Sequence, residues 1–137
     1  MDAIEAAPSR PRPQPIAETR AYWEGARNGR LLIQRCADCG RHQFYPRPFC
    51  TTCLAERVNW VEAAGRGHVV TFTICRIAAH PALTPPYAVA LVELDEGVRL
   101  LANIVDCELD AIRCGARVQV RFERLDDEIT LPQFTLV

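Results

Sequence analysis

The chain has 137 residues, of which 49% are hydrophobic, and its formal net charge is −1. This length suits one domain, or one domain with a small appended module, and the apolar content supports a single main core. The near-zero charge excludes the strong positive field with which many proteins attract nucleic acid or an anionic membrane.

The first 15 residues, MDAIEAAPSRPRPQP, lack the apolar core of a signal peptide, and no later run of ~18 apolar residues could span a bilayer. We therefore expect a cytoplasmic protein without a membrane partner. Because a reducing compartment keeps thiols free, the seven cysteines of the chain indicate metal binding rather than a disulfide framework.

Residues 1–17 contain four prolines and few apolar side chains, which predicts an extended or disordered tail. In residues 18–30, Thr19 is a plausible N-cap and an Asn-Gly pair a plausible stop, so a short helix is expected over about residues 20–28. Tyr22 and Trp23 give this helix an aromatic stripe. A helix this short is marginal alone and needs a surface on which to dock.

A ribbon is predicted over residues 31–58, where a strand leads into the spacing Cys36-x2-Cys39, ten residues, Cys50-x2-Cys53. Each pair sits on a tight turn that can direct two sulfurs at one ion, and two turns supply the four thiolates that zinc prefers at ~2.3 Å. All four ligands are then used, so no position is open for a catalytic water and the site is structural. Four-sulfur ligation selects zinc or iron, and spacing does not distinguish them.

Neighbouring residues agree with this metal site. Four thiolates and one Zn²⁺ leave a net charge of −4 + 2 = −2. Arg35, Arg41 and Arg47 flank the ligands in sequence closely enough to offset this charge. Gly40 follows the first pair and suits a turn with positive φ. His42 could be a ligand only if one cysteine were displaced, and is otherwise a surface residue.

The pattern changes to β over residues 59–137. HVVTFTICRI alternates in hydrophobicity, YAVALVEL and VRLLANIV form a hairpin around DEG, and RVQVRFERL and ITLPQFTLV supply two more strands. ELDAIRCG predicts a helical turn after the third strand, which is the layout of an OB fold. The expected class is mainly β: an N-terminal helix and zinc ribbon followed by a five-stranded OB-fold barrel.

Two further features each allow two interpretations. Arg66 stands between two glycines. The glycines would let the backbone approach a ligand closely, so this site could hold a phosphate. Alternatively, they form a tight turn that leads into the first barrel strand. Cys75 with His80 could form a nucleophile and base, or Cys75, Cys107 and Cys114 are free thiols packed as small hydrophobic side chains. We find no other catalytic constellation and expect no enzyme activity from the chain by itself.

Taken together, the chain resembles the DUF35 family, in which a rubredoxin-like zinc ribbon precedes a C-terminal OB fold. The resemblance covers about residues 18–137 and is carried by YWEGARNGRLLIQRCADCGRHQFYPRPFCTTC, GRGHVVTFT, PPYAVALVELDEGVRLLANIVDC and LPQF. One departure is Leu54, because the family usually has a glycine soon after the last ligand.

The resemblance implies a non-catalytic accessory subunit of a thiolase-superfamily enzyme, such as an acyl-CoA thiolase, an acyltransferase or an aldolase. It implies that the ribbon and the leading helix dock on the enzyme in a hetero-oligomer, while the barrel can contact the CoA ester. Tyr22 and Trp23 would then bind the partner, because aromatic residues dominate binding hot spots. The alternative is that they cover the chain's own barrel or ribbon.

A competing hypothesis is single-stranded nucleic-acid binding, which zinc ribbons and OB folds both perform elsewhere. The stretch from Arg66 to Asp106, however, contains three arginines and four acidic residues, so it is not basic. A groove for single strands should be basic and rich in aromatic residues, so we expect no nucleic-acid partner.

Overall fold

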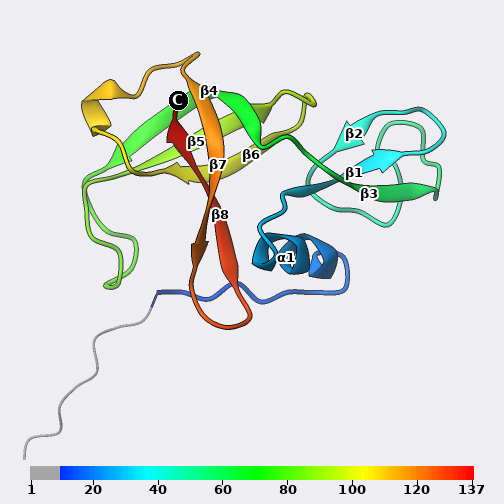
Figure 1. Ribbon diagram of the computed structural model, residues 1–137, viewed down its shortest axis with the longest axis horizontal. Helices are drawn as coiled ribbons and strands as arrows, with labels where there is room; N and C mark the ends of the chain where they lie inside the picture. Colours follow the sequence, from blue (N-terminus) through cyan, green and yellow to red (C-terminus); the bar gives the residue numbers. More distant parts are fainter. Residues whose placement is uncertain (1–9) are drawn as a thin grey trace, which may run out of the picture.

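The computed structural model describes residues 10–137, and the part of the predicted tail before residue 10 lies outside them. Figure 1 shows one short helix, a small ribbon and a barrel. The helix is α1 (Arg20–Arg27), and the ribbon holds β1 (Leu32–Cys36), β2 (His42–Gln43) and β3 (Val58–Glu62). The barrel strands are β4 (Arg66–Cys75), β5 (Tyr87–Leu94), β6 (Arg99–Ile104), β7 (Arg117–Arg124) and β8 (Thr130–Leu136). The mainly β class is confirmed.

Helix α1 forms over the residues that the sequence indicated. It ends at Arg27 with Asn28 as its C-cap, and Gly29 follows with a φ of +73°, a left-handed conformation that glycine adopts without strain. The Thr19 hydroxyl does not cap the helix but accepts a hydrogen bond from the N–H of Ile16 at 3.1 Å. A side chain at Gly25 would collide with Leu32, so this glycine lets α1 lie directly against the ribbon.

The ribbon is a three-stranded antiparallel sheet in the order β2-β1-β3. Ile33 of the central strand is fully buried, as is Leu31 just before it. Strand β3 pairs with β1 from Val58 to Glu62. The sheet of the ribbon therefore extends past residue 58, where the sequence suggested the boundary with the barrel.

The barrel closes in the order β4-β5-β6-β8-β7, with β7 paired back to β4. A 3₁₀ helix over Leu109–Ala111 follows the third barrel strand, as predicted for an OB fold. Val69, Val92 and Phe134 point into the closed interior and are fully buried. Strand β6 meets β8 in parallel at one residue pair only, so the barrel is weakest there.

Ribbon, helix and barrel share one hydrophobic core. Tyr22 and Ile33 belong to the same buried cluster as the barrel residues Val92 and Phe134. Helix α1 contacts both β1 and β8, which places it between the ribbon and the barrel. The carboxylate of Glu96, in the β5–β6 turn, also accepts a hydrogen bond at 2.8 Å from the N–H of Ala64 in the connecting segment.

Candidate metal centre and docking surface

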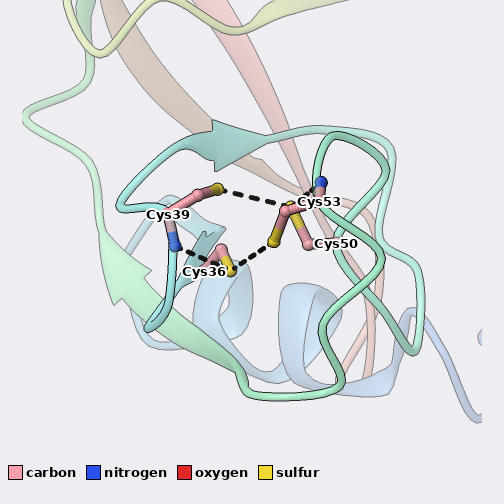
Figure 2. A group of neighbouring side chains, drawn as sticks. All are labelled: Cys36, Cys39, Cys50 and Cys53. Atoms are coloured by element: carbon pink, nitrogen blue, oxygen red, sulfur yellow. Dashed lines mark hydrogen bonds between the residues drawn. The ribbon is translucent and has the colours of Figure 1, made fainter.

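The four predicted ligands come together at one end of the ribbon. Figure 2 shows their side chains converging from two turns. All four sulfur atoms lie within 4.8 Å of one another, and the Cys36–Cys53 and Cys39–Cys50 Sγ distances are both 3.6 Å. Four sulfurs at ~2.3 Å from a tetrahedral ion would be about 3.8 Å apart. The cluster therefore fits one ion with four thiolate ligands.

Each cysteine pair sits on a turn in which backbone N–H groups face a sulfur atom. The N–H of Cys39 donates to the Sγ of Cys36 at 3.4 Å, and those of Thr52 and Cys53 donate to the Sγ of Cys50 at 3.4 and 3.5 Å. The first ligand of each pair is buried and the second is exposed. The two turns thus hold the sulfurs in equivalent ways.

These contacts shift the thiol pKa values in opposite directions. The N–H groups of Cys53 and Thr52 lower the pKa of Cys50 to about 6, and the N–H of Cys39 lowers the pKa of Cys36. At Cys53 the N–H of Ala55 also lowers the pKa, but the neighbouring Cys36 sulfur and burial outweigh it and raise the pKa to about 12. Four thiols this close cannot all ionise without a nearby cation, and a bound metal ion supplies that charge.

The residue after each pair adopts a left-handed conformation. Gly40 has a φ of +77° and Leu54 a φ of +67°. The N–H of each bonds back to the carbonyl of the first ligand, Gly40 to Cys36 at 3.0 Å and Leu54 to Cys50 at 2.9 Å. The leucine at position 54 therefore leaves the turn geometry intact. It adopts a left-handed conformation that is strained for leucine but not for glycine.

Two glutamines, which sequence reasoning did not single out, connect the ribbon strands to the segment before the second cysteine pair. The buried Gln34 amide donates to the carbonyl of Arg47 at 2.9 Å and accepts from the N–H of Arg47 at 2.8 Å. Gln43 donates to Gln34 at 2.8 Å and accepts from the N–H of Thr51 at 3.0 Å. Only tertiary contacts distinguish these glutamines from surface ones.

The two aromatic residues of α1 have different environments. Tyr22 is only 9% exposed, and burial raises the pKa of its hydroxyl above the ordinary value. Its ring packs against Trp23 and Phe44, with centroid distances of 5.0 and 5.4 Å. Trp23 is half-buried and keeps part of its surface in contact with solvent. Tyr22 thus belongs to the core, whereas Trp23 is available at the surface.

A groove of about 580 Å³ lies between α1, the ribbon and the β5–β6 hairpin. Trp23, Tyr45, Leu101, Pro13 and Arg99 are among the residues that line it. Tyr45 and Leu101 are exposed, at 47% and 72% of their surface. Large apolar side chains gathered on one face are typical of an interaction surface.

The remaining candidates are separate from the metal centre and the groove. Side chains at the glycines on either side of Arg66 would collide with Val120 and with the carbonyl of Glu93, so close strand packing accounts for both glycines. Arg66 itself is exposed, and its assignment to a ligand stays a prediction. The Nδ1 of His80 accepts from the N–H of Ala82 at 3.1 Å. Among the described residues, His80 has no hydrogen bond to Cys75.

Comparison with known proteins identifies the family. Residues 23–59 match "ChsH2, rubredoxin-like zinc ribbon domain" and residues 60–123 match "ChsH2, C-terminal OB-fold domain". A DUF35 domain-containing scaffold protein of Methanocaldococcus jannaschii is 30% identical over 72% of this chain and 71% of its own length. The chain belongs to the DUF35 family. As a DUF35 protein it has a rubredoxin-like zinc ribbon, whose cofactor is a structural zinc ion, and the four-sulfur cluster fits that ion.

Other relatives are named as enzyme subunits and are longer than this chain. A probable enoyl-CoA hydratase alpha subunit of Thermomonospora curvata is 42% identical over 97% of this chain. The benzoylsuccinyl-CoA thiolase subunit BbsA of Geobacter metallireducens is 34% identical over 63%. The chain spans only 42% and 57% of the lengths of these two proteins.

The fold also matches a solved DUF35 structure. The structure described as "Ltp2-ChsH2(DUF35) aldolase" has a TM-score of 0.84 and 40% identity, over 91% of this chain and 98% of that one. Relatives are thus named as scaffold proteins or as subunits of hydratase, thiolase or aldolase complexes. Within residues 10–137, no helix has the length and apolar character needed to cross a membrane.

Proposed function

We propose that this chain is a non-catalytic zinc-binding subunit of a thiolase-superfamily enzyme that acts on an acyl-CoA. The groove lined by Trp23, Tyr45 and Leu101 carries the proposal, because it gathers exposed large apolar side chains where the helix, the ribbon and the barrel meet. Relatives named as a thiolase subunit and as part of an aldolase with Ltp2 support this choice of partner. The four ribbon cysteines serve the metal and leave no site for chemistry there.

Within this interface, Trp23 is the proposed anchor and Tyr22 its support. Tyr22 meets the Trp23 ring edge-on at an interplanar angle of 77°, and Phe44 packs against Tyr22 from the other side. A ring held this way loses little conformational freedom when a partner covers it, which favours a binding hot spot. Tyr45 and Leu101 extend the same surface onto the ribbon and the barrel.

Contact between the barrel and the CoA ester is a further part of the proposal. Arg66 is an exposed cation at the start of β4 and is the candidate for a CoA phosphate. Replacing Arg66 by Gln should raise the KM of the assembled enzyme for acyl-CoA without changing the amount of complex. An unchanged KM would remove Arg66 from the site and leave the docking proposal intact.

The decisive experiment is co-purification with the product of the adjacent gene, which this proposal expects to be a thiolase-like protein, followed by an affinity measurement. Trp23→Ala should weaken the complex by about 2 kcal/mol, or about 30-fold in Kd, because a hot-spot ring is lost. Zinc content should not change, since Trp23 contacts none of the ligands.

Ile77→Ala is the matched control, because Ile77 is 87% exposed on the β4–β5 loop, outside the groove. It should leave the affinity unchanged. A Trp23→Ala protein that binds as tightly as the wild type, or that loses its own fold, would contradict the proposed role of the groove.

A further inference from the structure

The segment before α1 is fastened to the tip of the β7–β8 hairpin of the barrel. Residues 10–16 run past the tip of the β7–β8 hairpin before they reach the helix (Figure 1). Arg10 forms an ion pair with Glu123 at 3.0 Å, at the end of β7. Arg12 bonds to Asp126 at 2.7 Å and to Glu128 at 2.6 Å, both in the hairpin turn. Two arginines thus engage three carboxylates that lie more than 110 residues away in the sequence.

The local sequence of this segment explains how it can present two arginines to one surface. Arg10 and Arg12 alternate with prolines at positions 11, 13 and 15. Proline restricts its own φ and pushes the preceding residue toward extended conformations, so the segment is stiff and extended before it binds. Less conformational entropy is therefore lost when both guanidinium groups meet the hairpin.

Within the hairpin turn, backbone hydrogen bonds hold the Asp126 carboxylate in place. Asp126 accepts hydrogen bonds from the N–H groups of Glu128 and Ile129, both at 2.8 Å. Ile129 is fully buried, so the turn is anchored in the core while its acidic side chains face outward. The Arg12 side chain and these N–H groups keep the pKa of Asp126 near 2, so it is ionised at neutral pH.

We infer that the β7–β8 hairpin tip is a binding site for an extended peptide in which arginines alternate with prolines, and that the chain fills this site with its own residues 10–13. The inference does not depend on the enzyme partner. Each contact is an exposed ion pair and is weak alone. The segment is covalently attached, however, so its effective concentration is of millimolar order and weak contacts suffice to keep the site filled.

The attached segment also shapes two neighbouring features. Pro13 is one of the residues that line the groove beside Trp23, and Pro15 lies with Trp23 and Ile129 around a smaller hollow of about 250 Å³. The turn from Ile16 to Thr19 then leads directly into α1, with the N–H of Thr19 donating to the carbonyl of Ile16 at 3.0 Å. If Arg10 and Arg12 leave the hairpin, Pro13 can move away from the groove, and the residues that lead into α1 are no longer held.

The test uses the full zinc-bound chain and a capped synthetic peptide with the sequence of residues 10–16. The amide NMR signals of Glu128 and Ile129 report on the hairpin turn. In an R10Q/R12Q double variant these signals should shift, and adding the peptide should return them to their wild-type positions. The apparent Kd should be at least tenfold lower for the variant than for the wild-type chain, whose own segment competes.

Two controls separate specific recognition from a general charge effect. A peptide with Gln in place of both arginines should produce no shift. Adding E123Q and E128Q to the double variant removes two of the three carboxylates without disturbing the buried part of the turn. It should weaken binding of the wild-type peptide, because only Asp126 remains to pair with it. Equal affinity for the wild-type and variant chains, or binding of the Gln peptide, would overturn the inference, as would amide signals that do not move in the double variant.

Discussion

Leu54 and Gly40 occupy equivalent positions after the two cysteine pairs, and both have positive φ values. A left-handed conformation costs a non-glycine residue about 1–2 kcal/mol. Glycine avoids this strain, but it loses more conformational entropy on folding, which cancels part of the advantage. Leu54 is 70% exposed, so its side chain gains little from packing within this chain. The second turn of the ribbon is therefore less stable than the first for a reason confined to one residue.

We predict that Leu54→Gly raises the free energy of unfolding by about 0.5–1 kcal/mol, because strain is relieved and little buried surface is lost. Chemical denaturation of the zinc-bound protein measures this change. Gly40→Leu is the reciprocal control and should destabilise the protein, since it introduces the same strain into the first turn. A loss of stability in Leu54→Gly would show that the leucine makes a contact that outweighs its backbone strain.

At the scale of the elements, the ribbon depends on its metal far more than the barrel does. Its strand β2 has only two residues, and its second cysteine turn is joined to the ribbon sheet through side-chain hydrogen bonds of Gln43, which in turn bonds to Gln34. The barrel is closed by five longer strands around its own apolar interior. Structural zinc contributes on the order of 10 kcal/mol to the folding of small modules, which exceeds the usual stability of a domain.

We therefore predict one zinc ion per chain, and loss of the ribbon fold when the ion is removed by a chelator or when Cys50 is replaced by Ser. The barrel should retain its strands in both cases. Metal analysis by mass spectrometry and amide exchange of β1 and β5 would test the two parts separately. Protein purified without chelators that contains neither zinc nor iron would contradict the claim.

The ion pairs between residues 10–13 and the β7–β8 hairpin should respond to acid. The folded-state pKa of Asp126 is about 2, below its ordinary value of 3.8, because Arg12 and two backbone N–H groups stabilise the carboxylate. A depressed pKa contributes stability above pH 4 that is lost as the pH falls toward 2. We expect the Asp126 carboxylate signal in ¹³C NMR to titrate near pH 2, together with release of the segment.

Arg12→Gln is the control for this titration. It should raise the Asp126 midpoint but leave it below 3.8, because the N–H groups of Glu128 and Ile129 still donate to the carboxylate. A wild-type midpoint at the ordinary value would mean that Arg12 does not engage Asp126 in solution.

At the scale of the whole molecule, the distribution of charge argues against nucleic-acid binding. All three arginines of β7 are paired with carboxylates: Arg117 with Asp95, Arg121 with Asp106, and Arg124 with Asp127. Arg99 of β6 pairs with Glu93 at 3.0 Å. These cations are already neutralised, and the net charge of the chain is −1. Little counterion release would accompany binding to phosphates.

We predict no binding of single-stranded DNA or RNA at concentrations up to the micromolar range and ~150 mM salt. Fluorescence anisotropy with labelled oligonucleotides of mixed sequence would measure this. A Kd of micromolar or tighter at that salt concentration would count against the prediction and would revive the alternative function.

Local patterns in the sequence by themselves determined the zinc ribbon, the short helix and the positions of the five barrel strands along the chain. Cysteine spacing, turn residues and two-residue alternation act over a few positions, and each forms the same local structure in many contexts. The four ligands and the helix over residues 20–28 could therefore be read without coordinates. The OB-fold layout followed from strand count and the placement of one helical turn.

Only the tertiary structure decided which side chains face inward. It separated buried Tyr22 from accessible Trp23, although the two are adjacent and both aromatic, because Tyr22 packs against distant residues such as Phe44, just after β2. It also gave Gln34 its partners, and it joined Arg12 to Asp126 across 114 positions of the chain. Such contacts depend on how distant segments meet in space, and no pattern along a few residues carries that information.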